Sequence, residues 1–105
     1  MLKKPLTVRA LQDHIKRVDY QPDKKHEVVL KLFEDVGELS VEMRHEHTRG
    51  LSAAQKQKIK YELYDVLHYV THIANIYDID LEDAIIEKDR INADKYKDRG
   101  GNTDD

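Results

Sequence analysis

The fold of this chain is decided by Phe33-Glu34-Asp35-Val36-Gly37-Glu38-Leu39, a stretch whose pattern returns in Glu62-Leu63-Tyr64-Asp65-Val66. Both stretches contain the same five-residue pattern: an acid, an apolar residue, any residue, a second acid and a second apolar residue. Apolar residues recur around both stretches at the 3.6-residue spacing of an α-helix, which predicts long amphipathic helices over residues 24–46 and 53–77. The apolar residues that carry this prediction are Val29, Leu32, Val36, Leu39 and Met43 in the first helix, and Ile59, Leu63, Val66, Val70, Ile73 and Tyr77 in the second.

Shorter helices are predicted on either side of this pair, over residues 7–18 and 81–97. Pro22 separates the first of them from the long helices, because proline disfavours helical backbone at the residue before it. Short polar side chains stand where the four helices should begin, and they predict N-caps at Thr7, Asp23, Ser52 and Asp80. We therefore expect an all-α chain that forms a four-helix bundle.

The composition is that of one small domain. A chain of 105 residues can form one hydrophobic core but not two. The absence of cysteine excludes disulfides, cysteine-based zinc sites and a cysteine nucleophile. A net charge of −3 argues against a nucleic-acid partner, and no apolar run reaches the ~18 residues of a membrane span. We expect a cytoplasmic protein without nucleic-acid or membrane partners, with one domain over residues 1–98 and a disordered tail over residues 99–105.

The acids of the two stretches occupy matching positions on their helices. At about 100° per residue, Asp35 and Glu38 fall on one shoulder of the apolar stripe of the first long helix. Glu62 and Asp65 fall on the same shoulder of the second. If the two helices pack antiparallel through these stripes, all four carboxylates face one small volume, and Glu34 lies nearby.

Four carboxylates at close range repel one another, and partial burial adds a desolvation cost. Such a cluster is stable only if some of its members are protonated or a cation is bound. Oxygen ligands without cysteine favour Mg²⁺, Mn²⁺ or Ca²⁺. The alternative is that the acids form a solvated flank, as on many charged helices.

A polar stripe follows on the last predicted helix, where Lys88, Asn92 and Tyr96 recur every fourth residue. An ammonium, an amide and a phenol in line could bind phosphate oxygens or hydroxyl groups. Tyr69 lies between the angular positions of the two acids on the second long helix and could contact a ligand ring. All four side chains could equally lie at the edge of the core with their polar ends in water.

The two acidic stretches together resemble the EExxE…ExxD pattern of the MazG-like nucleoside triphosphate pyrophosphohydrolases. The run over residues 79–84, followed by Lys88, Asn92 and Tyr96, resembles the end of the same family's domain. The resemblance implies an all-α, Mg²⁺-dependent enzyme, with Mn²⁺ as a possible substitute. Such an enzyme cleaves an NTP or dNTP to the monophosphate and pyrophosphate.

The resemblance also implies roles for individual residues. The metal ligands would be Asp35, Glu38, Glu62 and Asp65. Catalysis would depend on Glu34, Glu38 and Glu62, with Glu34 binding a further metal ion or orienting the attacking water. The substrate would be bound by Tyr69, Lys88, Asn92 and Tyr96. The chain departs from the family pattern at Asp35, where the longer glutamate is usual, and it has no tryptophan for contact with the base.

Other interpretations remain. A di-iron bundle needs Glu-x-x-His on two helices. The pairs with similar spacing are Glu42–His45 and Asp65–His68, although His68 faces away from the acids. His68 and His72 could also bind zinc, but no further ligand stands near them in the sequence, so we interpret them as surface histidines. A non-catalytic nucleotide-binding or helical interaction module is the main alternative to an enzyme.

Apolar residues on the first long helix extend beyond the core stripe. Leu30, Phe33 and Val41 lie on its side away from the acids, together with Gly37, which allows a close helix approach. One small chain has no further helix to cover this surface. We therefore expect a homodimer or a dimer of dimers, with the two long helices at the interface.

Overall fold

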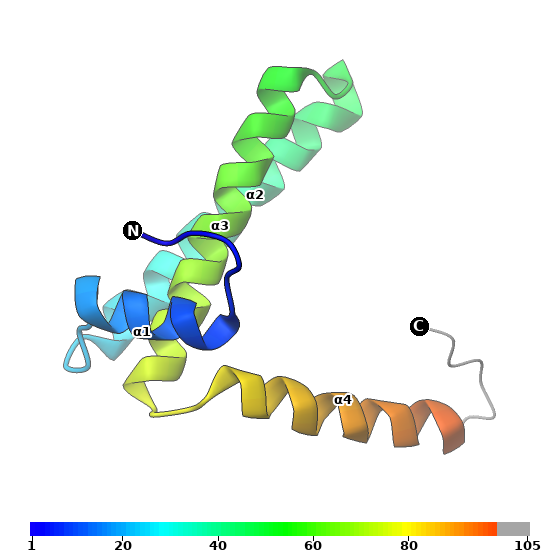
Figure 1. Cartoon of the computed structure of the whole chain (residues 1–105). Coiled ribbons are helices and arrows are strands. Elements are labelled where there is room, and N and C mark those ends of the chain that lie inside the picture. The colour runs from blue at the N-terminus through cyan, green and yellow to red at the C-terminus, as the bar shows by residue number, and fades with distance from the viewer. Residues whose placement is uncertain (99–105) are drawn as a thin grey trace.

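The computed structural model describes residues 1–98, and the side chains of residues 1–95. This part of the chain contains helices and no strand, which confirms the all-α fold class (Figure 1). The predicted tail over residues 99–105 lies outside the described residues. The helices are α1 (Val8–Val18), α2 (Lys25–Arg49), α3 (Ala53–Ile76) and α4 (Leu81–Asp98).

Most helix boundaries follow local capping chemistry. The side chains of Thr7, Ser52 and Asp80 each accept a hydrogen bond from a backbone N–H in the first turn of α1, α3 and α4. The prediction for Asp23 was wrong, because Lys24 occupies the cap position of α2 and makes no side-chain cap. Helix α2 also continues beyond its predicted end at residue 46 to Arg49. Gly50, whose φ of 79° suits glycine, is its C-cap.

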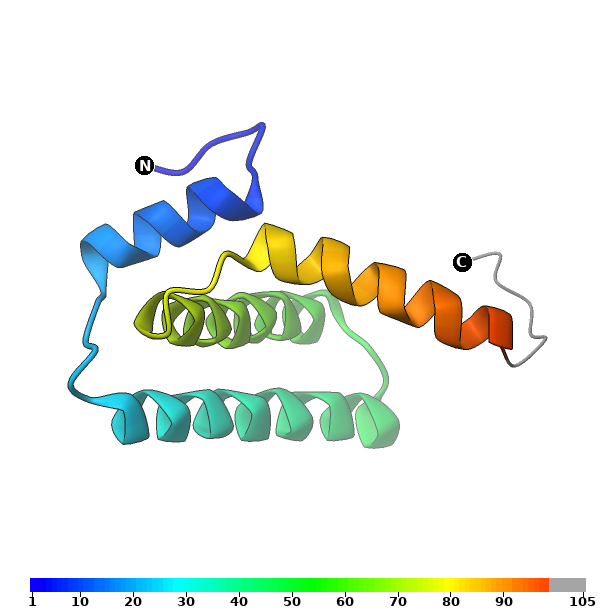
Figure 2. The ribbon, with the colours of Figure 1, turned by 90° about the horizontal axis from the view of Figure 1, so that it is seen from below.

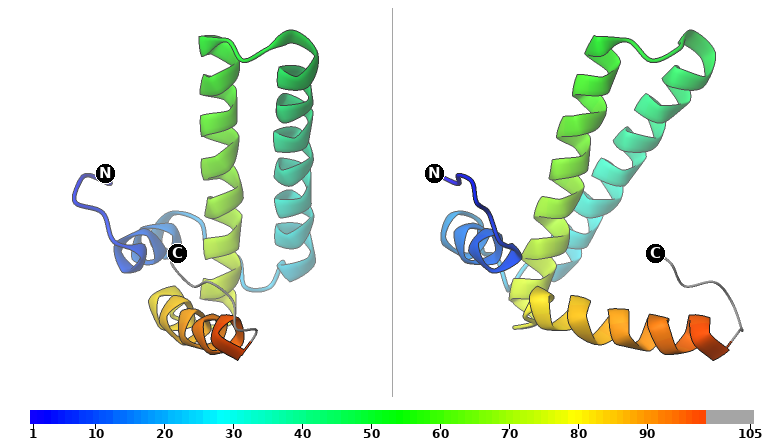
Figure 3. Two further views of the ribbon diagram at one scale, coloured as in Figure 1. Left: turned by 90° about the vertical axis from the view of Figure 1, so that its right-hand side faces the viewer. Right: turned by 45° about the vertical axis from the view of Figure 1, so that its right-hand side comes forward.

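Helices α2 and α3 form a long antiparallel hairpin, and α3 is the middle layer of the molecule. Figure 2 shows α2 on one side of α3, with α1 and α4 on the other. Helix α1 crosses the end of α3 and also contacts α4. Helix α4 then extends away from the long axis of the hairpin, as both views of Figure 3 show. The hairpin therefore has one end covered by α1 and one end that projects alone.

The apolar core lies at the covered end and is small. Its buried apolar side chains are Leu11, Ile15, Val28 and Ala74. Further along the hairpin, large apolar side chains remain accessible: Phe33 is 65% exposed and Leu63 is 54% exposed. On α4, Ile85 and Ile91 are also exposed. Such an extent of exposed apolar surface is unusual for a monomer. It is typical of a chain that buries this surface against a partner.

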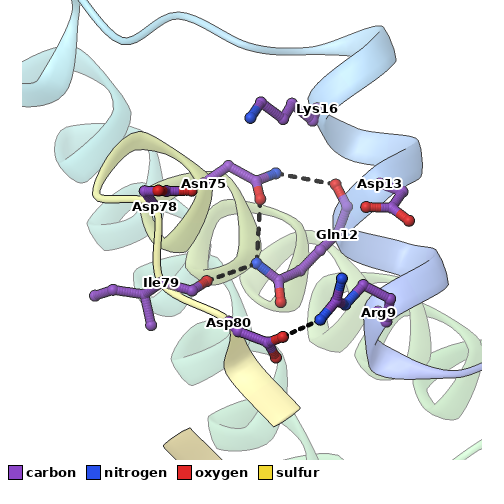
Figure 4. Close-up of a pocket in the computed structure, with 8 residues that line it drawn as sticks. All are labelled: Arg9, Gln12, Asp13, Lys16, Asn75, Asp78, Ile79 and Asp80. Carbon is purple, nitrogen blue, oxygen red and sulfur yellow. Dashed lines mark hydrogen bonds and ion pairs between the residues drawn. The ribbon is translucent and has the colours of Figure 1, made fainter. Parts of the chain in front are cut away.

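A buried polar junction fixes α1 to the turn between α3 and α4 (Figure 4). The Gln12 amide donates to Asn75 Oδ1 at 3.1 Å and to the Ile79 carbonyl at 2.8 Å, and its oxygen accepts the Leu81 N–H at 2.8 Å. Asn75 in turn donates to the Gln12 carbonyl at 3.0 Å. An ion pair between Arg9 and Asp80 closes the junction at its exposed side. These bonds set the direction in which α4 leaves the domain.

Replacing Gln12 with alanine should therefore destabilise the fold. The substitution leaves buried groups of Asn75, Ile79 and Leu81 without a partner, so we expect the free energy of unfolding to fall by at least about 2 kcal/mol. Urea unfolding at a fixed protein concentration measures the loss. Asp13→Ala, at an exposed position on the same helix, is the control and should change stability by less than about 0.5 kcal/mol. Equal stability of the two variants would show that the junction does not hold α1 in place.

Candidate metal centre

Carboxylates from α2 and α3 meet between the two helices. Asp35 of α2 and Glu62 and Asp65 of α3 each offer an oxygen atom, and these atoms lie within 4.8 Å of one another. The antiparallel packing thus places the two acidic shoulders opposite each other. Glu38 lies one turn along α2 from Asp35, and its carboxylate faces Glu62 closely enough to influence its protonation.

The pKa values of this cluster show that it is crowded with like charge. Burial, followed by the hydrogen bond and charge of Glu38 and the charges of Asp65 and Asp35, raises the pKa of Glu62 to about 7. Burial, followed by the charges of Asp65, Glu38 and Glu34, also raises the pKa of Asp35 above its ordinary value. The charged form of each acid is therefore disfavoured unless a cation compensates it.

One oxygen of the cluster is left without a partner. Glu62 Oε2 is buried and accepts no hydrogen bond from the described residues. A buried carboxylate oxygen without a partner carries a desolvation cost that a bound cation would remove. The donor set consists of carboxylate oxygens alone, which suits a hard divalent cation such as Mg²⁺ or Mn²⁺. The residues present therefore fit the metal that the sequence pattern predicts.

Glu34 and Tyr69 lie at the margins of this centre. Glu34 is exposed, contacts Lys31 Nζ at 3.6 Å and adds its charge to the field at Asp35. Tyr69 is partly buried on α3, and burial together with the charges of Asp19, Asp35 and Asp65 raises the pKa of its phenol. Tyr69 therefore lies between the acid cluster and the turn that follows α1.

The predicted substrate residues of α4 are not brought to the acids within one chain. The acid cluster lies between α2 and α3, whereas α4 lies on the opposite side of α3 and extends away from the hairpin (Figures 2 and 3). Lys88 is exposed there and Asn92 is half-buried. The side chain of Tyr96 lies outside the described residues. A single chain thus unites the acids and Tyr69 but not the polar stripe of α4.

A second polar cluster joins the turn after α1 to α3. His68 Nε2 lies 2.8 Å from Asp19 Oδ2, and His72 Nδ1 lies 3.5 Å from the same oxygen. His72 is fully buried and His68 is largely so. The interpretation of this pair as surface histidines was therefore wrong. No sequence signal pointed to Asp19, which follows the last residue of α1 and is far from the histidines along the chain.

The hydrogen bonds of this cluster indicate a structural role. The Gln21 N–H donates to His72 Nε2 at 3.0 Å, so neutral His72 carries its proton on Nδ1, which faces Asp19. Burial lowers the pKa of His72, although the charge of Asp19 opposes the shift. Burial disfavours ionisation of Asp19 as well, but hydrogen bonds from His68 and Gln21 outweigh it and lower its pKa. A protonated Nδ1 is not available to a metal ion, so this cluster anchors the turn to α3.

Two antiparallel helices that oppose acidic pairs form a centre whose carboxylate oxygens could hold a divalent cation. A family model described as the MazG nucleotide pyrophosphohydrolase domain matches residues 24–100, which is more than half of the chain. The chain therefore belongs to the MazG nucleotide pyrophosphohydrolase family, as its sequence pattern predicted. It is a hydrolase that acts on nucleoside triphosphates.

Solved structures agree with this assignment. The chain is similar to the crystal structure of N-terminally tagged iMazG from Vibrio DAT 722, with 37% identity and a TM-score of 0.72 over 87% of this chain and 98% of that one. The C-terminally tagged iMazG from the same organism gives 36% identity and a TM-score of 0.71, over 84% and 99% of the two chains. A search of the curated proteins gave no match. None of the described helices is long and apolar enough to cross a membrane.

Proposed function

We propose that this protein is a Mg²⁺-dependent nucleoside triphosphate pyrophosphohydrolase. It cleaves an NTP or dNTP between the α- and β-phosphates and releases the monophosphate and pyrophosphate. The observation that carries this proposal is the cluster of Asp35, Glu62 and Asp65, in which a buried Glu62 oxygen has no partner. Mn²⁺ is the expected substitute, because it shares the preference of Mg²⁺ for carboxylate oxygens.

In this proposal the ion is held by four acids of the hairpin: Asp35, Glu38, Glu62 and Asp65. When bound, a divalent cation would offset the negative charge of the phosphates and lower the pKa of a water that it coordinates. Catalysis would depend most on Glu38 and Glu62, because these two acids hold the cation from opposite helices and so fix where a phosphate bound to it would lie. Glu34, at the exposed rim, orients the attacking water or holds a further ion.

The substrate residues come from two regions of the fold. Tyr69 lines the nucleoside side of the site, where its ring is already partly buried. Lys88, Asn92 and Tyr96 bind phosphate and sugar. Because α4 lies across α3 from the acids in one chain, we propose that these α4 residues serve the site of a second copy.

A second copy also explains the exposed apolar surface. Phe33, Leu63 and Leu67 of the hairpin are each at least 45% exposed, and α4 adds Ile85 and Ile91. Burial of this surface against an identical chain gives a homodimer, or a dimer of dimers, with α2 and α3 at the interface. Each site would then be incomplete without its neighbour.

Product analysis on a panel of NTPs and dNTPs tests the proposed reaction. Release of pyrophosphate and monophosphate in Mg²⁺, and none in EDTA, is the expected result. Release of orthophosphate and diphosphate would place cleavage at the other anhydride bond. If no nucleotide is turned over under any metal condition, the enzymatic proposal is wrong.

A non-catalytic nucleotide-binding module is the second candidate, and Asp35 is the observation that favours it. Aspartate is one methylene shorter than the glutamate usual at this position of the family pattern, so its oxygen reaches less far toward a shared ion. Nucleotide binding without turnover in the same panel would identify this function.

A further inference from the structure

The turn over residues 19–24, which joins α1 to α2, is held to α3 by two histidines. In the described part of the chain, every hydrogen bond and ion pair between this turn and α3 involves His68 or His72. Asp19 Oδ2 lies 2.8 Å from His68 Nε2 and 3.5 Å from His72 Nδ1. The backbone N–H of Gln21 donates to His72 Nε2 at 3.0 Å. Otherwise the turn is exposed, so these contacts decide whether it stays docked.

The hydrogen bond from Gln21 requires a nitrogen of His72 that carries no proton. An imidazolium is protonated on both ring nitrogens, so its Nε2 would present an N–H to the Gln21 N–H and could not accept from it. The ring is fully buried in the docked state, which leaves no water beside Nε2 to take up the new proton in a hydrogen bond. Protonation of His72 and docking of the turn therefore oppose each other.

His72 is faced by titratable groups of the turn, of α3 and of α2, which are Asp19, His68, Tyr69, Glu27 and Lys31. Asp19 favours the imidazolium, but the same carboxylate oxygen also contacts His68. Glu27 and Lys31, which line one cavity with His72, carry opposite charges that offset each other. The phenol stays neutral because its pKa is raised. Burial has the largest effect and lowers the pKa of His72.

We propose that His72 is an acid-sensitive latch, which holds the turn over residues 19–24 against α3 while its Nε2 carries no proton and releases the turn when that nitrogen is protonated. One proton passes from solvent to Nε2, and the Gln21 N–H loses its acceptor. The turn forms part of the wall of a cavity of about 120 Å³ that Tyr69 lines from α3, so its release would open this cavity. The latch does not depend on the reaction proposed above.

The direction of the pH dependence follows from the shift of the pKa. Because the pKa of docked His72 lies below the ordinary value of 6.5, the released turn binds the proton more tightly than the docked turn. The latch is therefore at full strength above pH 6.5 and weakens as the pH falls from there through the pKa of the docked state. Helix α1 should stay in place, because the amide of Gln12 does not titrate.

Amide hydrogen exchange measured by NMR in metal-free buffer tests the latch. Between pH 7.5 and pH 5 the protection factor of the Gln21 N–H should fall by at least ~5-fold, since each unit by which docking lowers the pKa favours release by up to ~10-fold in acid. The Leu81 N–H, which donates to Gln12 Oε1 at 2.8 Å, is the internal reference. Its protection factor should not fall over the same range.

Two variants separate His72 from other titrating groups. Glutamine in His72→Gln offers an oxygen acceptor that does not titrate, so the Gln21 protection factor should change by less than about 2-fold between the two pH values. His26→Gln removes an exposed histidine from the first turn of α2 and should keep the full pH dependence.

The unmodified protein decides the question even if His72→Gln does not fold. Long-range ¹H–¹⁵N spectra should show His72 protonated on Nδ1 alone at pH 7.5 and on both nitrogens over the range in which Gln21 loses protection. A Gln21 protection factor that is equal at pH 7.5 and pH 5 would overturn the proposal. An equal loss at Leu81, or a loss at Gln21 while His72 stays neutral, would overturn it as well.

Discussion

Glu62→Gln should lower pyrophosphate release by at least ~100-fold while the helical content of the protein is unchanged. Loss of a residue that merely supports a metal ligand costs ~10- to 100-fold, so loss of a ligand itself should cost more. Glutamine preserves the size of the side chain but removes the negative charge that balances the proposed cation. The measurement is product formation in Mg²⁺ over a range of metal concentrations, with circular dichroism as the check on folding.

The same variant should alter the dependence of stability on pH. The pKa of Glu62 in the folded chain is about 7, whereas its ordinary value is 4.5. The folded state therefore holds a proton that the unfolded chain has already released between these two values. Without metal, the stability contributed by protonated Glu62 is present below pH 4.5 and is lost as the pH rises through 7. Glu62→Gln should remove this part of the pH dependence and be the more stable protein at pH 8.

The control for both measurements is Glu46→Gln, which changes an exposed carboxylate near the end of α2. It should leave turnover within about 2-fold and preserve the pH profile of the unmodified protein. Full activity in Glu62→Gln would exclude Glu62 from the metal centre. Urea unfolding in EDTA at pH 5 and pH 8 provides the stability comparison.

Phe33→Asp should convert the proposed oligomer to monomers and abolish turnover. Phe33 is 65% exposed in the single chain, so the substitution costs little within the subunit but places a charge in the proposed interface. Because the α4 residues of the site are proposed to come from a second copy, dissociation should remove activity as well. Light scattering measures the mass, and product release measures the activity.

The matched control is Val18→Asp, which introduces the same charge at a position 61% exposed at the end of α1. This variant should remain oligomeric and active. A monomeric mass for the unmodified protein at micromolar concentration would contradict the proposed assembly. A dimeric, fully active Phe33→Asp would remove Phe33 from the interface.

The acid cluster was predictable from sequence because helical periodicity fixes the angle of every side chain. Asp35 and Glu62 occupy equal angles on their helices, and the short connection after α2 forces those helices to run antiparallel. These two facts bring the carboxylates together without any knowledge of distant contacts. Thr7 and Asp80 were predictable in the same way, because an N-cap acts only on the turn beside it.

The polar junctions were not predictable, because each depends on residues far apart in the chain. Gln12 meets Asn75 only after α1 has folded across α3. Asp19 meets His68 through the same crossing, and neither residue lies in a pattern that marks it. The direction of α4 is a further example, since a helical wheel gives the face of a helix but not its orientation in the fold.

A titration with Mn²⁺ tests the central claim, that acids of two helices hold one divalent cation. At pH 7 the unmodified protein should bind Mn²⁺ at one strong site per chain, and binding should release a fraction of a proton because Glu62 must ionise. Calorimetry in two buffers of different ionisation enthalpy measures both quantities. Glu62→Gln should weaken Mn²⁺ binding by at least ~10-fold and release no proton. Equal Mn²⁺ affinity and equal proton release in the two proteins would contradict the account.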